Sequence, residues 1–407
     1  MKKKLVVALI SAAMVTSMLG ACGSSNASSS SASSTATSSV SASSASEEDT
    51  TAASSSVSAS SASEEVSADA DQEAADKVAA LIDAIYVQER NDNTDEQCKE
   101  AKEAWDALTD AQKELVEGEN ADPDYFGRDT GDASKDDPLN GDEIGENELL
   151  VVSFGTSYND SRRLTVGAIE NAIETAFPDY SVRRGFTSQI IIDHVKKRDN
   201  VAIDNVAEAL NRAIDNGVKN LVVQPTHLMN GLEYTDLVNE LAENSDAFEH
   251  VAVGEPLLTS DDDFKAVISA ITDATKEYDD GETAICFMGH GTEADSNAVY
   301  QKMQDMLKEE GFDNYYVGTV EATPSCEDVI AQVKEGSYKK VVLEPLMIVA
   351  GDHANNDMAG DDDDSWKSQF KAAGYEVTCL VRGLGELEPI QQLFVQHAQA
   401  AIDSLAK

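Results

Sequence analysis

The feature that most constrains this chain is a regular alternation of short apolar runs and amphipathic helical stretches from residue 147 onward. The eight runs are "ELLVVSFGTS", "YSVRRGFTS", "NLVVQPTHLM", "HVAVGEPLL", "TAICFMGHGT", "NYYVGTVEA", "KVVLEPLMIV" and "YEVTCLVRG". Their length, β-branched content and flanking turns indicate buried strands. Helical patterns lie between them, for example at 162–176, 202–216, 262–277 and 298–310. Repeated strand–helix units predict an α/β fold with parallel sheets flanked by helices.

The eight predicted strands divide into two similar sets of four. The segments "VVQPTHLMNGLEY" and "VLEPLMIVAGDHA" align without a gap, which places Gly231 over Gly351 and Glu233 over His353. The segment "VVSFGTS" likewise resembles "CFMGHGT", and "RGFTS" resembles "VGTVEA". This pattern indicates an internal duplication. It predicts two similar α/β domains that face each other across a cleft.

The N-terminus has the features of an export signal. A basic "MKKK" precedes an apolar stretch that is too short to span a bilayer as a mature helix. The stretch ends in "LGAC", which resembles a bacterial lipobox, so Cys22 is the expected lipidation site. We therefore expect an exported protein, lipid-anchored at the outer face of a bacterial cytoplasmic membrane. The alternative is an ordinary secretory peptide with an incidental cysteine.

Composition divides the chain into six segments. They are a lipoprotein signal peptide (1–21), a disordered Ser/Ala-rich stalk (22–66), a small helical module (67–118), an acidic linker (119–146), and the two α/β halves (147–280 and 281–407). In the helical module, Thr109 and Gln112 have capping-box spacing, as do Thr94 and Gln97. Three helices are expected there, with Ala101, Trp105 and Leu108 facing their core.

Charge and cysteine usage exclude some classes of function. The formal net charge is −46, and so acidic a surface repels phosphate backbones, which excludes nucleic acid as a partner. The same surface attracts cations, although acidic tails also serve solubility alone. The cysteines after Cys22 form no CxxC pair, so buried free thiols are expected rather than a disulfide framework: Cys98, Cys286, Cys326 and Cys379.

Polar side chains follow several predicted strands, where parallel sheets bind their ligands. In the second half these are His290, Glu321 and His353. In the first half they are Ser157, Ser188, His227 and Glu233.

The other histidines are expected to have no role in a site. His194 and His397 lie in helical patterns among polar residues, which indicates surface positions, and His250 begins a strand. Two neutral imidazoles and one carboxylate on the strand ends of the second half suit a first-row divalent ion with open coordination positions. The chain has no G-x-S-x-G elbow, and "MGHGT" has the wrong spacing for a P-loop or a dinucleotide fingerprint.

Residues 148–403 resemble the anaerobic sirohydrochlorin cobalt chelatases of the CbiK type, in the class II chelatase fold. The resemblance rests on six blocks in order and at compatible spacing: "LLVVSFGTSYND", "FTSQII", "NGLEY", "FMGHG", "VGTVEATP" and "PLMIVAGDHANNDMAGDDDDSWK". The last block is the most specific. The resemblance covers the α/β region but neither the stalk nor the helical module.

The resemblance implies a lyase that inserts Co²⁺ into a tetrapyrrole and releases two protons, as in anaerobic cobalamin biosynthesis. It makes His290, Glu321 and His353 the metal ligands, with His290 also the proton acceptor. Glu233 matches a carboxylate that faces the same cleft and is taken as a second catalytic residue. No organic cofactor is implied. The chain departs from the family at Leu232, where relatives often have Asp, and at Asn159, where some have His.

Other charged groups have two interpretations each. A group of cations in the first half could clamp the carboxylates of sirohydrochlorin or provide a soluble helix surface: Arg162, Arg163, Arg183, Arg184, Lys196, Lys197 and Arg198. The run Asp361 to Asp364 could concentrate cations or form a solvated loop. Asp352 and Asp357 are candidates to orient His353.

Export fits poorly with cobalamin synthesis, whose precursor is made in the cytoplasm. Two alternatives therefore stay open: an Fe²⁺ chelatase, and a surface lipoprotein that binds haem, another tetrapyrrole or a metal for an uptake transporter. The oligomeric state also stays open, with a homo-oligomer among the options.

Overall fold

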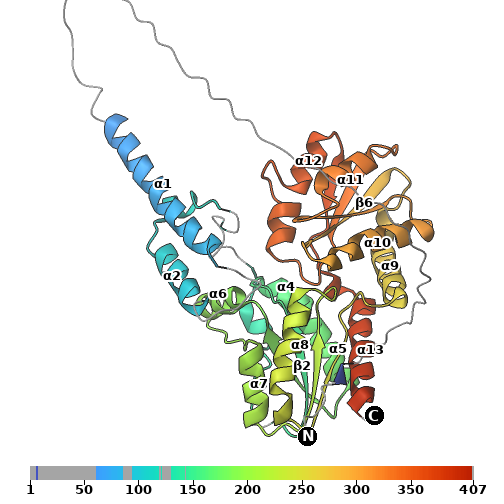
Figure 1. The fold of residues 1–407 in the computed structure, drawn as a ribbon. Helices are drawn as coiled ribbons and strands as arrows, with labels where there is room; N and C mark the ends of the chain where they lie inside the picture. Colours follow the sequence, from blue (N-terminus) through green and yellow to red (C-terminus); the bar gives the residue numbers. More distant parts are fainter. Residues whose placement is uncertain are drawn as a thin grey trace, which may run out of the picture. The chain divides into compact units, whose positions relative to one another are not determined.

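The computed structural model describes residues 6–7, 61–85, 94–118, 121, 130–142 and 144–405 (Figure 1). Internal contacts place the described residues from 71 onward, together with Val6–Val7, in one compact unit. The predicted signal peptide and stalk, including Cys22, lie outside the described residues except for Val6–Val7 and the start of the first helix. Among the described residues, no helix combines the length and apolarity needed to cross a membrane.

Two parallel sheets form the α/β region, as the strand-like runs predict. The first consists of β2 (Asn147–Ser153), β3 (Ser181–Phe186), β4 (Asn220–Pro225) and β5 (His250–Val253), with the two-residue β1 (Val6–Val7) beside β5. The second consists of β6 (Thr283–Gly289), β7 (Tyr315–Thr319), β8 (Lys340–Pro345) and β9 (Glu376–Cys379). The first sheet has the order β5-β4-β2-β3 and the second β9-β8-β6-β7. Each of β2 to β5 thus has a counterpart in the same place in the second sheet, as expected of two similar halves.

Helices connect the strands of both sheets. In the first half they are α4 (Asn159–Leu164), α5 (Val166–Ala176), α6 (Gln189–Asp199), α7 (Val206–Asp215), α8 (Leu232–Asn244) and α9 (Asp261–Thr275). In the second half they are α10 (Ala298–Glu309), α11 (Cys326–Val333), α12 (Trp366–Ala372) and α13 (Glu388–Leu405). Capping boxes begin several of them, including Ser260 with Asp263 at α9 and Ser325 with Asp328 at α11.

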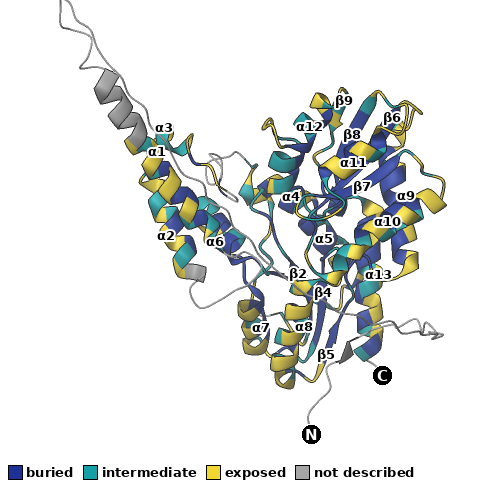
Figure 2. Cartoon of the chain, turned by 45° about the horizontal axis from the view of Figure 1, so that its top comes forward, coloured by how far each residue is buried: buried dark blue, intermediate teal, exposed yellow. Residues whose placement is uncertain are grey.

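The two halves share one hydrophobic core. Figure 2 shows the central strands fully buried beneath partly exposed helices. One cluster contains Val151 of β2 and Phe287 of β6, together with Phe264 of α9 and Phe394 of α13. The C-terminal helix α13 contacts α5, β4 and β5 of the first half as well as α9. Burial of this continuous apolar surface, at roughly 25 cal/mol per Å², therefore couples the folding of the two halves.

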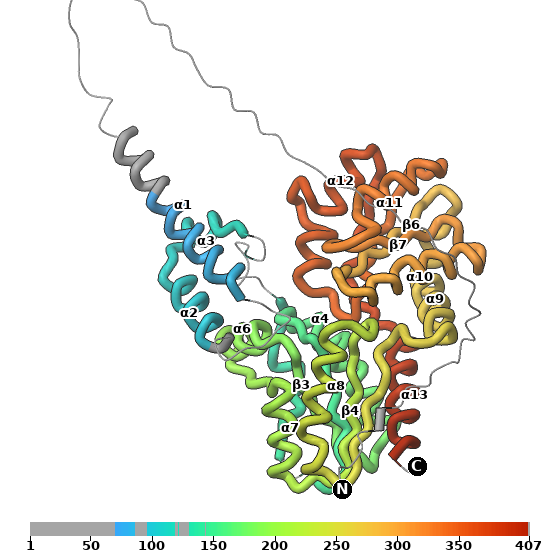
Figure 3. Tube along the Cα trace, in the orientation of Figure 1, coloured from blue at the N-terminus to red at the C-terminus, as the bar shows by residue number. Residues whose placement is uncertain are grey.

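The helical module consists of α1 (Ser61–Asp83), α2 (Thr94–Asp106) and α3 (Asp110–Lys113). Its first helix begins inside the range predicted as stalk. Trp105 and Ala101 are buried in its core and Leu108 packs against it, as expected. The Thr109–Gln112 capping box is present. Ile190 of α6 belongs to the same cluster, so the module packs on the first half, as the neighbouring α2 and α6 in Figure 3 show.

The acidic segment before β2 is part of the first half. Asp136, which is only 3% exposed at its side chain, forms ion pairs with Arg162 and Arg184 at 2.7 and 2.6 Å. Arg184 also pairs with the buried Glu170 at 2.6 Å. Asn159 donates a hydrogen bond to the Gly131 carbonyl and accepts one from Arg162. Asn159 thus helps to hold Arg162 in this group of buried ion pairs, which we call the buried anchor: Asp136, Arg162, Arg184 and Glu170.

The carboxylate-clamp interpretation of the first-half cations is therefore wrong for Arg162 and Arg184. Both guanidinium groups are buried and neutralised within the fold. Arg198 is similarly paired with Asp199 at 2.6 Å. The sequence did not reveal the pairing of Arg162 and Arg184 with Asp136, because Asp136 lies 26 and 48 residues earlier in the chain.

Candidate metal centre

The second half brings together three side chains that could hold a metal ion. His290 follows β6, Glu321 follows β7 and His353 lies in the segment after β8. One ligand atom from each lies within 4.8 Å of the others. His290 Nε2 is 3.5 Å from Glu321 Oε1, and the two imidazole rings are 4.6 Å apart at their centroids. The three residues predicted as ligands from the sequence thus form one cluster.

Hydrogen bonds hold both imidazoles by Nδ1. His290 Nδ1 lies 2.9 Å from the Gly291 carbonyl oxygen, which can only accept. His353 Nδ1 lies 2.8 Å from Asp357 Oδ2. In the neutral form of each ring, Nδ1 carries the proton and Nε2 keeps a lone pair, and a hydrogen-bond acceptor on Nδ1 orients metal-binding histidines in the same way.

The local backbone explains how His353 reaches its partner. A short π-helical turn, Ala354–Met358, follows His353 directly. It places Asp357 against the ring, while Asp352 instead accepts a hydrogen bond from Asn356. Of the two carboxylates predicted to orient His353, Asp357 thus makes the direct contact. Asp361 to Asp364 form an exposed loop in which Asp361 pairs with Lys367 at 2.7 Å.

The two histidines differ in their affinity for protons. Burial lowers the pKa of His290, and the neighbouring His353 lowers it further, against the opposing effect of Glu321. Burial also disfavours the charged form of His353, but the hydrogen bond and charge of Asp357 outweigh it and raise the pKa of His353. A neutral His290 is the form that a metal ligand or proton acceptor needs.

Tyr300, on α10, supports the loop that carries His290. Its hydroxyl oxygen accepts a hydrogen bond from the Gly291 N–H at 3.3 Å. A Cβ on Gly289 would lie 2.1 Å from the Tyr300 ring, so only glycine fits there, and Gly291 has φ of 95°. Tyr300 was not predicted from the sequence, because a tyrosine in an amphipathic helix has no local feature that distinguishes it from a core residue.

Glu233 lies at the start of α8 in the first half and close to this loop. Its charge contributes to raising the pKa of Tyr300 to about 12, after burial. Burial, followed by the charge of Asp236, raises the pKa of Glu233 itself. A carboxylate with a raised pKa is suited to proton transfer.

The remaining first-half candidates do not join the cluster. His227 is buried, which lowers its pKa to about 4, and neither ring nitrogen has a hydrogen-bond partner among the described residues. Ser188 is completely buried. Ser157 uses its carbonyl oxygen to bind Arg198 and Thr130.

Two histidines expected at the surface are not surface residues. His194 is 7% exposed on α6, and burial lowers its pKa to about 3. The helical module covers α6, and this long-range contact was not visible in the local pattern. His397 lies between Asp263 Oδ1 and the Glu255 carbonyl, at 3.0 and 3.1 Å. His250 is exposed at the start of β5, as expected.

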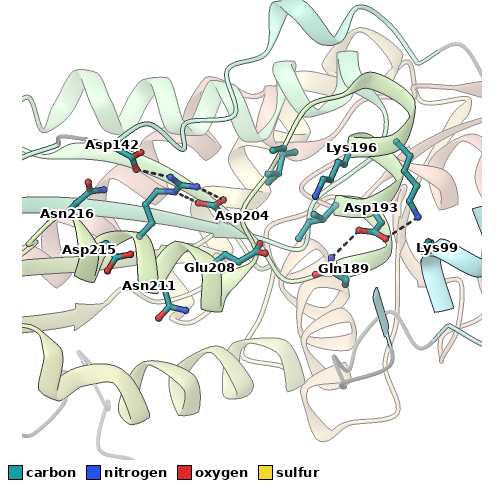
Figure 4. A pocket seen from close by; sticks show the side chains of 15 residues that line it. Lys99, Asp142, Gln189, Asp193, Lys196, Asp204, Glu208, Asn211, Asp215 and Asn216 are labelled. Atoms are coloured by element: carbon teal, nitrogen blue, oxygen red, sulfur yellow. Dashed lines mark hydrogen bonds and ion pairs between the residues drawn. The ribbon is translucent and has the colours of Figure 1, made fainter. Parts of the chain in front are cut away.

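A cavity of about 780 Å³ lies away from the metal centre, beside α2, α6 and α7 (Figure 4). Charged groups of both signs line it, and Arg212 there is paired with Asp204 and Asp142. None of the three clustered residues contributes to it.

The four cysteines after Cys22 form no disulfide framework among the described residues, which agrees with the prediction. Cys98, Cys286 and Cys326 are buried and Cys379 is partly buried.

Comparison with known proteins places this geometry in a family. The family model described as cobalt chelatase (CbiK) matches residues 147–403. This chain belongs to the cobalt chelatase family. It is 37% identical over 255 residues to "Sirohydrochlorin cobaltochelatase" of Salmonella typhimurium, covering 63% of this chain and 96% of that protein. It is 29% identical over 262 residues to "Sirohydrochlorin cobaltochelatase CbiKC" of Nitratidesulfovibrio vulgaris, covering 63% and 91%.

Solved structures with a similar arrangement include "SirB from Bacillus subtilis with Fe3+", at 13% identity and a TM-score of 0.46. The match covers 65% of this chain and 98% of that one. The family model and the curated relatives confirm the prediction of a metal chelatase, a lyase, and the two four-stranded parallel sheets of β2–β5 and β6–β9 confirm the predicted α/β fold. The matched range of the family model begins at β2, so it contains the metal centre but not the helical module.

Proposed function

We propose that this chain inserts Co²⁺ into sirohydrochlorin, with His290, Glu321 and His353 as the residues that hold the incoming metal. The observation that carries the proposal is the cluster of one carboxylate and two imidazoles, whose rings are held through Nδ1 so that Nε2 is the nitrogen left for a metal. Three protein ligands leave coordination positions open for the macrocycle nitrogens.

The reaction requires two protons to leave the pyrrole nitrogens as the metal enters. When Co²⁺ moves from His290 Nε2 to the macrocycle, that lone pair becomes available to accept one proton. The lowered pKa of His290 keeps it neutral until then. Glu233, whose pKa is raised, is the acceptor that we assign to the second proton. Metal and protons thus exchange places, and the charge balances.

The location that we propose is the outer face of a bacterial cytoplasmic membrane, with a lipid on Cys22. The basic, apolar and "LGAC" segments support it. This location favours a second candidate function, a tetrapyrrole- or metal-binding lipoprotein that serves an uptake transporter. Fe²⁺ is the alternative metal for the enzyme, because imidazole and carboxylate ligands also suit it.

The test is an anaerobic absorbance assay of the purified protein with sirohydrochlorin and Co²⁺. Spectral conversion faster than without protein is expected, with loss of activity in His290→Ala and in His353→Ala. The matched control is His250→Ala, which removes an exposed histidine at the amino end of β5 and should retain activity. Tight macrocycle binding without accelerated conversion would reject the enzyme and favour the binding lipoprotein. Repeating the assay with Fe²⁺ compares the two metals.

A further inference from the structure

The strand-end positions of the metal centre have defined counterparts in the first half. Ser153 pairs with Phe186 across β2 and β3, as Gly289 pairs with Thr319 across β6 and β7. The next residue after β2 is therefore Phe154, and the next after β6 is His290. Phe154 is thus the counterpart of the first metal ligand.

Main-chain hydrogen bonds confirm this correspondence. The carbonyl of Phe154 accepts from Ser188 N at 3.3 Å, and the carbonyl of His290 accepts from Glu321 N at 2.9 Å. The glycines that follow, Gly155 and Gly291, have nearly equal positive φ angles of 101° and 95°. Ser188 is therefore the counterpart of Glu321.

The gapless alignment of the loops after β4 and β8 extends the correspondence. It matches Glu233 to His353 and Leu232 to Asp352. In each half, the residues that follow these strands form one edge of the sheet. The main-chain features described above recur at both edges, whereas the side chains differ. Where the second half has two histidines and two carboxylates, the first half has Phe154, a buried serine, Leu232 and a single carboxylate.

Reciprocal contacts make these two edges face each other. A Cβ on Gly351, two residues before His353, would lie 3.1 Å from Thr156 Oγ1 of the first half. A Cβ on Gly231, two residues before Glu233, would lie 3.8 Å from Ser296 Oγ of the second half. The Ala350 N–H also donates to Ser161 Oγ across the halves at 3.0 Å. Each edge thus touches the other through equivalent loops.

Two apolar side chains on the first-half edge have no place in the core. Phe154 is only partly buried, and it belongs to none of the hydrophobic clusters formed by the described residues. Leu232 is 54% exposed, the largest fraction among the exposed large hydrophobic residues of the described chain. Exposed apolar side chains beside a chemical centre indicate a surface that a ligand covers.

We propose that Phe154 and Leu232 form an apolar wall that holds the flat face of the tetrapyrrole opposite the metal-holding residues. This inference rests on the proposed function and assigns the macrocycle side of the same site. An aromatic ring can stack on a conjugated macrocycle, and a leucine excludes water from its face. One edge then presents the metal, and the other presents the macrocycle.

The test separates macrocycle binding from metal insertion. Binding of metal-free sirohydrochlorin is titrated by its fluorescence, and insertion is measured at saturating macrocycle. Phe154→Ala should raise Kd and KM roughly tenfold, by the loss of one aromatic contact. Leu232→Ala should raise them less. At saturation, kcat should stay within about threefold of the wild type.

The control variant is Phe312→Ala. Phe312 is also partly buried, but it precedes β7 at the opposite end of the strands and contacts Tyr315 edge-to-face. Phe312→Ala should lower the unfolding midpoint and leave the Kd for sirohydrochlorin unchanged. Phe154→Ala should raise this Kd and leave the unfolding midpoint unchanged. An unchanged Kd in Phe154→Ala, or no macrocycle binding by the wild type, would reject the proposal that Phe154 and Leu232 form an apolar wall. Macrocycle binding by the wild type without metal insertion would reject only the proposed enzyme activity. The Kd values of the variants would still test the apolar wall in that case.

Discussion

Replacing Asp136 by alanine is expected to destabilise the first α/β half, although this residue lies before the first strand of that half. Asp136 Oδ2 accepts hydrogen bonds from Arg162 Nε at 2.7 Å and from Arg184 Nη1 at 2.6 Å, and its Oδ1 accepts from Arg184 Nη2 at 3.0 Å. The side chains are 3%, 0% and 1% exposed, in the order Asp136, Arg162 and Arg184. The two arginine charges therefore depend on protein partners rather than on water.

The size of the effect follows from which partners remain. In Asp136→Ala, Arg184 keeps the carboxylate of Glu170. Arg162 keeps neutral acceptors, the Thr156 carbonyl and the side chain of Asn159. Removing one partner of a buried ion pair costs about 3–5 kcal/mol. With about 2–4 °C lost per kcal/mol in a domain of this size, Tm should fall by about 6–20 °C.

The assay is thermal unfolding followed by far-UV circular dichroism. The control is Asp142→Ala, because Asp142 belongs to the same segment and pairs with Arg212 at 2.8 Å, but its side chain is 66% exposed. An exposed pair contributes about 0–1 kcal/mol. A Tm for Asp136→Ala within 2 °C of this control would refute the buried anchor. By the same reasoning, a fragment that begins at residue 130 should be more stable than one that begins at 147.

Two further predictions concern carboxylate–histidine pairs. Asp357→Asn removes the charge beside His353 Nδ1 and should weaken Co²⁺ binding about 10- to 100-fold, as measured by calorimetry. The control Asp362→Asn changes an exposed carboxylate and should leave Co²⁺ binding unchanged. His397 is held by Asp263, whose hydrogen bond and charge outweigh burial and raise the pKa of His397. The wild type should therefore exceed His397→Gln in urea stability below about pH 6.5, and the difference should shrink as pH rises through the raised pKa; a difference that grows with pH contradicts this.

Local pattern was sufficient for the strands, for their duplication and for the metal cluster. Buried parallel strands have runs of apolar residues, and the ends of such strands converge in any parallel sheet. His290, Glu321 and His353 could therefore be brought together without knowing any long-range contact. Position at a strand end was not sufficient by itself, because it also selected Ser157, Ser188 and His227; the combination of two histidines and a glutamate distinguished the second half.

Burial of polar side chains was not accessible in the same way. His194 looks like a surface residue because its own helix is polar, and it is buried by a module about ninety residues earlier in the chain. Arg184 looks like an available cation, and its neutralisation depends on Asp136 in a segment that reads as linker. Such contacts join segments that are distant in the sequence, so the local periodicity of apolar residues does not predict them.

The divergence of the two edges leads to a last prediction, on metal stoichiometry. Phe154→His places an imidazole at the counterpart of His290, and Glu233 stands at the counterpart of His353. The third position is Ser188, which is fully buried and has no carboxylate. Two ligands do not make a site comparable with a three-ligand centre.

Calorimetric titration of this variant with Co²⁺ should therefore still give one tight site per chain. Adding His290→Ala to Phe154→His should leave no tight site. A second tight site in the single variant would show that the first-half edge can hold metal by itself. The specialisation of one half for metal would then rest on the single residue at position 154, rather than on the three side chains that now differ between the two edges.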